Sequence, residues 1–372
     1  MQKNWFSIGL MSGTSGDGVD ASIIRTNGIN EYESIKDKYF EYDSDIYKDI
    51  HNLKDKVHRI EHLKLYEKEI TSLERNITIF HAKLIKEFDT NDDCIIGFHG
   101  QTIYHNPKEK ISRQLGNGKL LNQLTNKNVV YDFRSNDILN GGQGAPLTPV
   151  FHHLLSVQNK LSLPVCFLNI GGISNITIVK NKKNLSELIS RDIGPGNCLI
   201  DRWMRKNSNE KFDRDGLIAS SGTRNEIFFE QAQDLYLNRI DKKKLSYDTN
   251  DFDISFMRGL SLENGAKTLT DFTASIIGEE LTQSLNNLKE KIKEILLCGG
   301  GRKNKFLIKK IKENLTSNIN LKIIDDYNID GDFIESQAFA FLAVRSILKL
   351  PISFPSTTGC SVSASGGKLI KC

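Results

Sequence analysis

The stretch IGLMSGTSGDGVDASII, residues 8–24, decides how the rest of the chain is interpreted. Apolar residues alternate with smaller ones up to Ser12, and the alternation resumes at Val19. This period of two is typical of half-buried β-strands. Three glycines, two hydroxyl residues and an aspartate stand between the two runs. The sequence therefore predicts a β-hairpin whose polar loop is longer than an ordinary hairpin turn.

The glycines of this loop are expected to allow positive φ, so that successive backbone N–H groups can bind phosphate oxygens. A dinucleotide-binding fold is excluded, because its G-x-G-x-x-G motif opens a helix and here a strand pattern follows. The chain also contains no P-loop motif G-x-x-x-x-G-K-[ST]. A glycine-rich turn without a ligand stays open as the alternative. The predicted nucleotide contacts on this hairpin are Gly13, Thr14, Ser15, Gly16, Asp17, Gly18, Val19 and Asp20.

The composition bounds the class of protein. The 372 residues exceed the size that one hydrophobic core usually serves, so two domains are expected. The formal net charge of +4 is small, which predicts no nucleic-acid partner. The six cysteines form no C-x-x-C pair and are expected to be reduced. No apolar run resembles a membrane span or a signal peptide, so a cytoplasmic protein without a membrane partner is predicted.

Two further strand patterns end in polar side chains. The first ends in His99, Gln101 and Thr102, and the second ends in Arg134. Strand ends carry binding sites in α/β proteins, so these side chains are predicted to face a sugar or a phosphate. A simple capped turn remains the alternative for the first group.

A second strand, glycine turn and strand at residues 165–179 repeat the pattern of the first hairpin and place Asn169, Gly171 and Gly172 at the turn. A later strand runs into three further glycines, which would let a flat ring approach the backbone. The predicted fold is α/β, with two actin-like (RNase H-like) domains facing a central nucleotide and substrate cleft. Phosphates are expected at the two hairpins and adenosine at Gly299, Gly300 and Gly301.

The expected domains are residues 1–160, residues 161–348 and a tail, 349–372, that packs back on the first domain. Amphipathic spacing predicts a long helix whose apolar stripe runs from Leu63 to Phe80. Another helix is expected over residues 332–348, where alanines suit a domain interface.

The sequence resembles the anhydro-N-acetylmuramic acid kinases, a family of the actin-like ATPase and sugar kinase superfamily, over nearly its whole length. The resemblance rests on ordered blocks of sequence: GLMSGTS at 9–15, GQT at 100–102, DFR at 132–134, GGQGAPL at 141–147, NIGG at 169–172, GPGN at 194–197, FDRDG at 212–216 and CGGG at 298–301. It implies a cytoplasmic bacterial enzyme of peptidoglycan recycling. Such an enzyme uses ATP, Mg²⁺ and water to convert 1,6-anhydro-N-acetylmuramic acid to N-acetylmuramic acid 6-phosphate.

The resemblance also implies roles for individual residues. Asp192, just before the GPGN block, is the expected base that deprotonates the water attacking C1 of the sugar. A helix cap remains its alternative role. Asp17 and Asp20 are the expected water-mediated contacts to Mg²⁺. The side chains expected to hold the sugar are His99, Gln101, Thr102, Arg134 and Glu335.

Two other functions stay open, and a homodimer is expected. One is a different actin-like kinase that phosphorylates an ordinary hydroxyl group. The other is a non-catalytic actin-like nucleotide sensor. ATP turnover with the anhydro sugar, with an ordinary hexose and without sugar separates the three.

Overall fold

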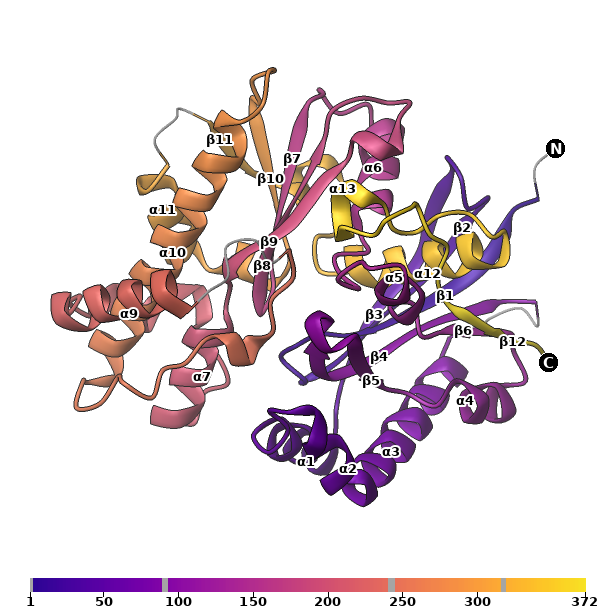
Figure 1. Ribbon diagram of the computed structural model, residues 1–372, viewed down its shortest axis with the longest axis horizontal. Coiled ribbons are helices and arrows are strands. Elements are labelled where there is room, and N and C mark those ends of the chain that lie inside the picture. The colour runs from indigo at the N-terminus through magenta and orange to yellow at the C-terminus, as the bar shows by residue number, and fades with distance from the viewer. Residues whose placement is uncertain (1–2, 89–92, 240–244, 316–318) are drawn as a thin grey trace. The chain divides into compact units, whose positions relative to one another are not determined.

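The computed structural model describes residues 3–88, 93–239, 245–315 and 319–372. The chain divides into two compact units, which are described separately. Unit 1 comprises Met1–Leu161, Lys182–Ile189 and Asp332–Cys372, and unit 2 comprises Ser162–Asn181 and Ser190–Gly331. Each unit combines a β-sheet with helices (Figure 1), which confirms the predicted α/β class.

Unit 1 is built on a mixed sheet. Its strands in the described residues are β1 (Trp5–Ser12), β2 (Gly18–Thr26), β3 (Tyr32–Glu41), β4 (Ile95–Asn106), β5 (Ile111–Leu115), β6 (Val129–Tyr131) and β12 (Lys368–Ile370). The order is β12-β6-β4-β1-β2-β3, and β5 pairs with β4. β1 and β2 form the predicted antiparallel hairpin, with Met11 opposite Asp20. β3 is antiparallel to β2, whereas β4 is parallel to both β1 and β6.

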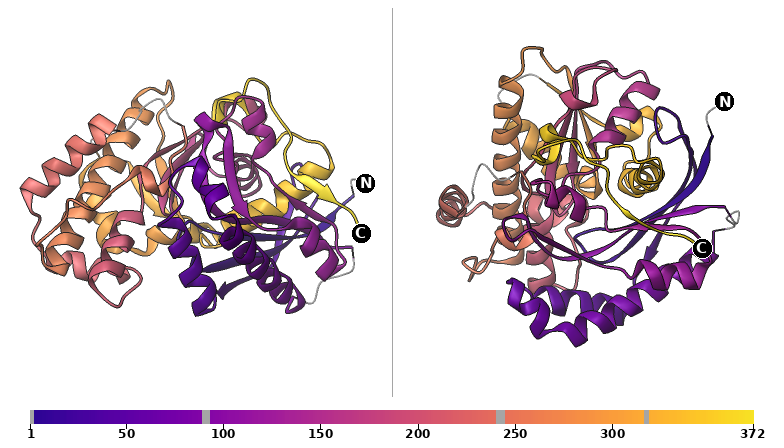
Figure 2. Two further views of the ribbon diagram at one scale, coloured as in Figure 1. Left: turned by 60° about the horizontal axis from the view of Figure 1, so that its bottom comes forward. Right: turned by 45° about the vertical axis from the view of Figure 1, so that its right-hand side comes forward.

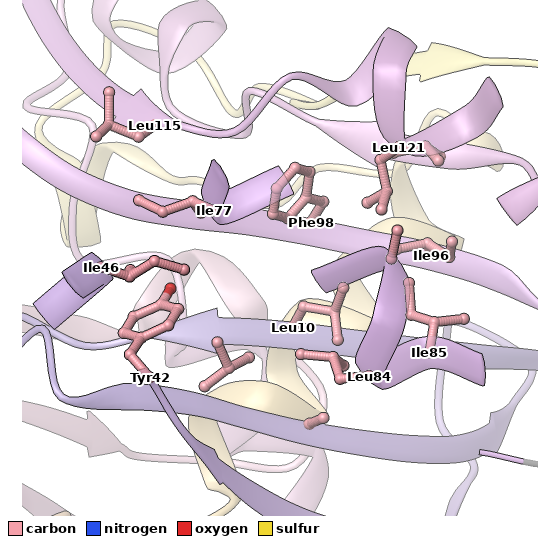
Figure 3. Close-up of a cluster of buried hydrophobic side chains, with 14 of the residues drawn as sticks. Leu10, Tyr42, Ile46, Ile77, Leu84, Ile85, Ile96, Phe98, Leu115 and Leu121 are labelled. Atoms are coloured by element: carbon pink, nitrogen blue, oxygen red, sulfur yellow. The ribbon is translucent and has the colours of Figure 1, made fainter. Parts of the chain in front are cut away.

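One face of this sheet packs against helices that follow β3. The helices of unit 1 are α1 (Ser44–Lys54), α2 (Ile60–Leu65), α3 (Glu67–Lys86), α4 (Gly118–Thr125), α5 (Ser135–Leu139), α6 (Pro149–Gln158), α12 (Ile334–Ile347) and α13 (Pro355–Thr358), with 3-10 turns η1 (Pro107–Glu109) and η2 (Leu185–Glu187). Leu10 and Phe98 of the sheet join Ile77 of α3 and Leu121 of α4 in one buried cluster (Figure 3). The predicted single helix is divided at Tyr66, which caps the end of α2.

The other face of the sheet is covered by α12, the longer of the two yellow helices in Figure 2. A Cβ on Gly9 would lie 1.8 Å from the carbonyl oxygen of Ser336, and one on Gly97 would lie 2.3 Å from that of Phe339. Ser7 Oγ also donates to the carbonyl oxygen of Ala340 at 2.9 Å. This helix was expected in the second domain, whereas small residues of β1 and β4 let its backbone lie directly on the first sheet.

Two edges of the sheet of unit 1 carry strands that local patterns did not reveal. β3 was not expected, because most of its side chains are exposed, half of them are charged, and they give no apolar alternation. At the other edge β12 pairs antiparallel with β6, so the tail of the chain adds a strand to this sheet.

Unit 2 repeats this arrangement. Its strands in the described residues are β7 (Val165–Ile170), β8 (Ile173–Val179), β9 (Ile189–Pro195), β10 (Glu294–Cys298) and β11 (Asn320–Ile323), in the order β11-β10-β7-β8-β9. β7 and β8 form the predicted antiparallel hairpin, and β10 is parallel to both β7 and β11. In both units a hairpin continues into a third strand on one side and parallel strands follow on the other, which is the RNase H-like order. The two predicted similar halves are confirmed, and the cleft between them remains a prediction.

The helices of unit 2 gather around its longest one, α10. They are α7 (Cys198–Asn207), α8 (Leu217–Ser221), α9 (Glu226–Arg239), α10 (Leu262–Asn286) and α11 (Lys305–Glu313), with 3-10 turns η3 (Arg214–Gly216), η4 (Thr249–Asp251), η5 (Gly300–Lys303) and η6 (Ile324–Tyr327). α10 packs against α7, α8, α9 and α11. Arg191 of β9 forms an ion pair with Glu280 of α10 at 2.7 Å, which ties the strand to the helix.

Candidate active site

Residues 13–17 join β1 to β2 and form a tight polar loop. The Gly16 N–H donates to the carbonyl oxygen of Gly13 at 3.2 Å, and Gly16 has a φ of +67°. The expectation of positive φ is wrong for Gly13 and for Gly18. Gly18 is glycine for another reason, because a Cβ there would lie 2.4 Å from the carbonyl oxygen of Phe40. The loop is therefore shaped by one left-handed residue and by the close approach of β3.

The loop presents backbone donors that the protein itself does not use. Among the described residues, the N–H groups of Thr14 and Ser15 donate to no acceptor. Both residues lie at the surface of the loop, so these groups are available to an anion. Val19 differs from these two residues, because the whole residue is buried in the core of unit 1.

Carboxylates gather next to this loop. Ser15 Oγ donates to Asp17 Oδ1 at 2.6 Å. Burial, followed by the negative charges of Asp17, Glu41 and Asp20, raises the pKa of Tyr39 above its usual value. Asp17 and Asp20 therefore lie close to the same tyrosine, at the end of β2 that begins at the loop.

Of the predicted sugar-binding side chains, His99 and Arg134 are in direct contact. Arg134 Nη2 and Nε donate to His99 Nε2 at 2.9 and 3.2 Å, and His99 Nδ1 donates to the carbonyl oxygen of Gly100 at 2.7 Å. Burial first, and then the charge of Arg134, lowers the pKa of His99 well below its usual value. The imidazole is therefore neutral, and it holds the guanidinium together with the carbonyl oxygen of Gly144.

Helix α12 brings a third predicted sugar contact towards this pair. The ring of Phe339 packs on that of His99 with centroids 4.5 Å apart. Glu335 precedes Phe339 by four residues, and that spacing places both side chains on one face of the helix. Glu335 is half-buried in the first turn of α12.

Gln101 and Thr102 are placed differently from one another. The Gln101 side chain is fully buried, and its Nε2 donates to the carbonyl oxygen of Gly13 at 3.0 Å. It thus contacts the loop, whereas the sequence analysis assigned it to the sugar. Thr102 Oγ1 accepts a hydrogen bond from Gln114 Nε2 at 3.2 Å on the neighbouring strand.

Lys54, which no motif singled out, donates from Nζ to the carbonyl oxygen of Thr14 at 2.5 Å.

In unit 2 the second predicted phosphate turn packs on the GPGN block. The N–H of Asn197 donates to the carbonyl oxygen of Gly171 at 2.8 Å, and that of Gly196 donates to Gly172 at 2.9 Å. A Cβ on Gly196 would lie 2.2 Å from the Gly171 carbonyl oxygen, so only glycine permits this contact. Asn169, at the end of β7, is also buried.

The three glycines after β10 form a turn against the same hairpin. Gly299 has a φ of +76°, and a Cβ on it would lie 2.3 Å from Asn169 Oδ1. A Cβ on Gly301 would lie 2.2 Å from Cγ2 of Ile170, whereas one on Gly300 would meet nothing within 4 Å. The structure therefore brings Asn169 and the predicted adenosine turn together, with open space at Gly300.

Asp192 lies within β9, and 6% of its surface is exposed. Its Oδ2 accepts the N–H of Tyr247 at 2.7 Å, and its own N–H donates to the carbonyl oxygen of Leu245. These contacts fix the carboxylate in one orientation. Asp192 does not cap the helix that follows it, because α7 begins at Cys198 and among the described residues no side chain accepts a hydrogen bond at its N-terminus.

The described residues show neither a metal cluster nor a membrane-spanning helix. No group of three or more histidine, cysteine or acidic side chains is placed to bind a metal ion. No helix in this part of the chain combines the length and the apolar character needed to cross a bilayer.

Comparison with known proteins agrees with these motifs. A sequence profile of the family described as anhydro-N-acetylmuramic acid kinase matches residues 5–371. A protein of that name from Pelagibacter ubique (strain HTCC1062) is 55% identical over 374 residues, covering 100% of both chains. Another from Zymomonas mobilis subsp. mobilis (strain ATCC 31821 / ZM4 / CP4) is 36% identical, covering 98% of this chain and 99% of the relative.

Among solved structures, component A of (R)-2-hydroxyglutaryl-CoA dehydratase from Acidaminococcus fermentans aligns with a TM-score of 0.42 and 12% identity. That alignment covers 93% of this chain and 100% of the other. The profile match and the two full-length relatives show that the chain belongs to the anhydro-N-acetylmuramic acid kinase family.

Proposed function

We propose that this chain is an ATP-dependent kinase that converts 1,6-anhydro-N-acetylmuramic acid to N-acetylmuramic acid 6-phosphate in peptidoglycan recycling. Membership of the family over residues 5–371 is the observation that carries the proposal. In the reaction, water attacks C1 and the C1–O6 bond breaks. O6 takes the γ-phosphoryl group from ATP, ADP leaves, and the water proton passes to a base.

The loop at residues 13–17 is the proposed phosphate site. The N–H groups of Thr14 and Ser15 are its donors, because the protein leaves them without an acceptor among the described residues. The turn from Gly299 to Gly301 is the proposed adenosine site, since Gly300 leaves room beside the backbone for a flat ring. Asn169, Gly171 and Gly172 are the proposed second phosphate contact, at the end of β7.

Mg²⁺ fits the acidic side of the loop. Mg²⁺ in kinases usually binds through one or two carboxylates, water and the phosphates, so a full protein cage is not required. Asp17 and Asp20 would hold it through water, because Asp17 lies in the loop beside Ser15 and Asp20 lies close to the start of β2, opposite Met11. When bound, the ion neutralises the charge of the β- and γ-phosphate oxygens.

Asp192 is the proposed general base. A base must be held in reach of the water proton, and Tyr247 N–H fixes one carboxylate oxygen of Asp192 within a strand. Arg134 is the proposed partner of the carboxylate on the lactyl group of the sugar, because a guanidinium binds a carboxylate by two parallel hydrogen bonds. Its contact with the neutral His99 holds it ready for that role. Thr102 and Glu335 are further proposed sugar contacts.

One experiment tests this function directly. Purified protein is incubated with ATP and Mg²⁺, and ADP formation is measured with 1,6-anhydro-N-acetylmuramic acid, with glucose and with no sugar. The proposal predicts ADP formation with the anhydro sugar and none with glucose or without sugar. Turnover with glucose would favour an ordinary sugar kinase, and no turnover in any arm would contradict an enzymatic role. The same preparation tests the expected homodimer by sedimentation velocity.

A further inference from the structure

Two side chains from different elements reach the carbonyl oxygens of the phosphate loop. Gln101 Nε2, from β4, donates to the carbonyl oxygen of Gly13 at 3.0 Å. Lys54 Nζ, from the last residue of α1, donates to the carbonyl oxygen of Thr14 at 2.5 Å. Two successive carbonyl groups of the loop are thus bound from within unit 1.

The Gln101 amide is itself fixed by a buried chain of hydrogen bonds. Its Oε1 is 2.6 Å from Ser12 Oγ, which donates to it. Tyr42 Oη donates to the same Ser12 oxygen at 3.0 Å. All three side chains are buried. The orientation of the amide follows from its nitrogen, which donates to the carbonyl oxygens of Gly13 and Thr102 at 3.0 and 3.2 Å and leaves the oxygen facing Ser12.

Lys54 is held in place by the helix that carries it. Ile46, Ile50 and Leu53 anchor α1 in the core of unit 1. Ile50 also lies against the loop, because a Cβ on Gly16 would stand 2.8 Å from its Cγ2. The base of the lysine side chain is thus part of a rigid surface next to the loop.

Because the peptide bond is planar, these contacts also set the directions in which the N–H groups of the loop point. In a planar trans peptide the C=O of one residue and the N–H of the next point in opposite directions. Binding the Gly13 carbonyl on the protein side therefore directs the Thr14 N–H away from the protein. Binding the Thr14 carbonyl does the same for the Ser15 N–H. These are the two N–H groups that donate to no acceptor in the described part of the chain.

We propose that Gln101 and Lys54 are positioning residues, which fix two successive peptide planes so that the Thr14 and Ser15 N–H groups face a phosphate of ATP. The inference rests on the proposed function of the loop. Donors that are oriented before the ligand arrives need no rearrangement when charge develops on the phosphate. Neither side chain needs to touch the nucleotide for this effect.

The test measures the affinity of a non-hydrolysable ATP analogue by calorimetry. Gln101→Met keeps the length of the side chain, Lys54→Met shortens it by one atom, and both remove the donor. Each is expected to weaken analogue binding about tenfold, the effect of one hydrogen bond. Lys54→Arg should restore most of the affinity, because a guanidinium can still donate to the Thr14 carbonyl. The Kd of the anhydro sugar should stay within twofold of the native value.

Matched controls come from the same unit. Gln158 makes a comparable pair of hydrogen bonds to the backbone of Tyr32, so Gln158→Met removes similar contacts far from the loop in sequence. Lys48→Met removes an exposed lysine from the same helix as Lys54. Both controls should leave analogue binding unchanged. Gln101→Glu is a second test, since it keeps the shape of Gln101 but sets a carboxylate against the Gly13 carbonyl.

The outcomes separate this inference from the proposed function. Gly13→Val changes the loop itself, where a Cβ would meet only Ser15 Oγ, at 3.8 Å. If Gly13→Val weakens analogue binding while both methionine variants and Gln101→Glu bind normally, the positioning role is wrong. An equal loss of sugar affinity in the methionine variants would also overturn it, since it would indicate general loosening of unit 1. If Gly13→Val binds the analogue normally, the phosphate site itself is wrong.

Discussion

Replacing Asp192 by asparagine is the sharpest test of the chemistry, because it removes a base and keeps a hydrogen-bond acceptor. The amide oxygen can still accept the Tyr247 N–H, which the carboxylate accepts at 2.7 Å. Loss of general-base catalysis typically costs 10² to 10⁴ in rate. This range equals about 3 to 5 kcal/mol of activation free energy.

The cost to folding should be much smaller. A hydrogen bond to a charged group contributes about 1.5–3 kcal/mol, against about 1 kcal/mol for a neutral one. Asp192→Asn should therefore lower the free energy of unfolding by about 1 kcal/mol, or the melting temperature by about 2–4 °C for a unit of this size. A rate loss of a hundredfold or more cannot come from that loss of stability.

The assay measures kcat with the anhydro sugar and the Kd of a non-hydrolysable ATP analogue, which should be unchanged. A matched control is Asp213→Asn, because Asp213 is another buried carboxylate of unit 2 that accepts backbone N–H groups, from Ile218 and Ala219. The native reaction is also run in ¹⁸O-labelled water. The label should appear at C1 of the sugar and be absent from the phosphate, since O6 was already part of the ring.

Two results would refute the reasoning. If kcat of Asp192→Asn stays within about threefold of the native value, Asp192 is not the base. If ¹⁸O appears in the phosphate, water attacks ATP, and the coupled opening of the ring is wrong as well.

Three further predictions concern stability. Gly9→Ala would set a methyl group 1.8 Å from a backbone oxygen of α12, so denaturant unfolding should show the free energy of unfolding lowered by about 3 kcal/mol or more. A decrease below about 1 kcal/mol would contradict the close packing. Gly301→Ala should lower the melting temperature, because its Cβ would lie 2.2 Å from a side chain of β7, whereas Gly300→Ala, with nothing within 4 Å, should leave it unchanged. Burial lowers the pKa of His81 to about 4, that of His152 to about 3 and that of His99 well below its usual value. The unfolded chain therefore binds protons below pH 6.5 that the folded chain does not, so urea unfolding should show the free energy of unfolding falling by about 2 kcal/mol per histidine from pH 7 to pH 5. A flat profile would contradict the lowered pKa values.

Local patterns predicted the parts of the fold that are close in sequence. Both hairpins were predicted, because alternation of apolar residues and a glycine turn are contained within about 17 residues. The third strand of unit 1 was not, since an exposed edge strand needs no apolar alternation.

The missed features of the site depend on contacts across long stretches of chain. Gln101 meets Gly13 across 88 residues, and Lys54 meets Thr14 across 40. No motif records such a contact, so Lys54 was not singled out and Gln101 was assigned to the sugar. The packing of α12 on β1 was missed for the same reason, although the small residues on both sides were noted.

The placement of α12 has a consequence for synthesis on the ribosome. Unit 1 is interrupted after Leu161 and completed only from Asp332, about 170 residues later. At a translation rate of 5–20 residues per second, the first sheet waits roughly 10–30 s for the helix that covers it. During that interval the face formed by Ser7, Gly9 and Gly97 is open to other nascent chains and to chaperones. The order of translation thus makes the first half of the chain the last to finish folding.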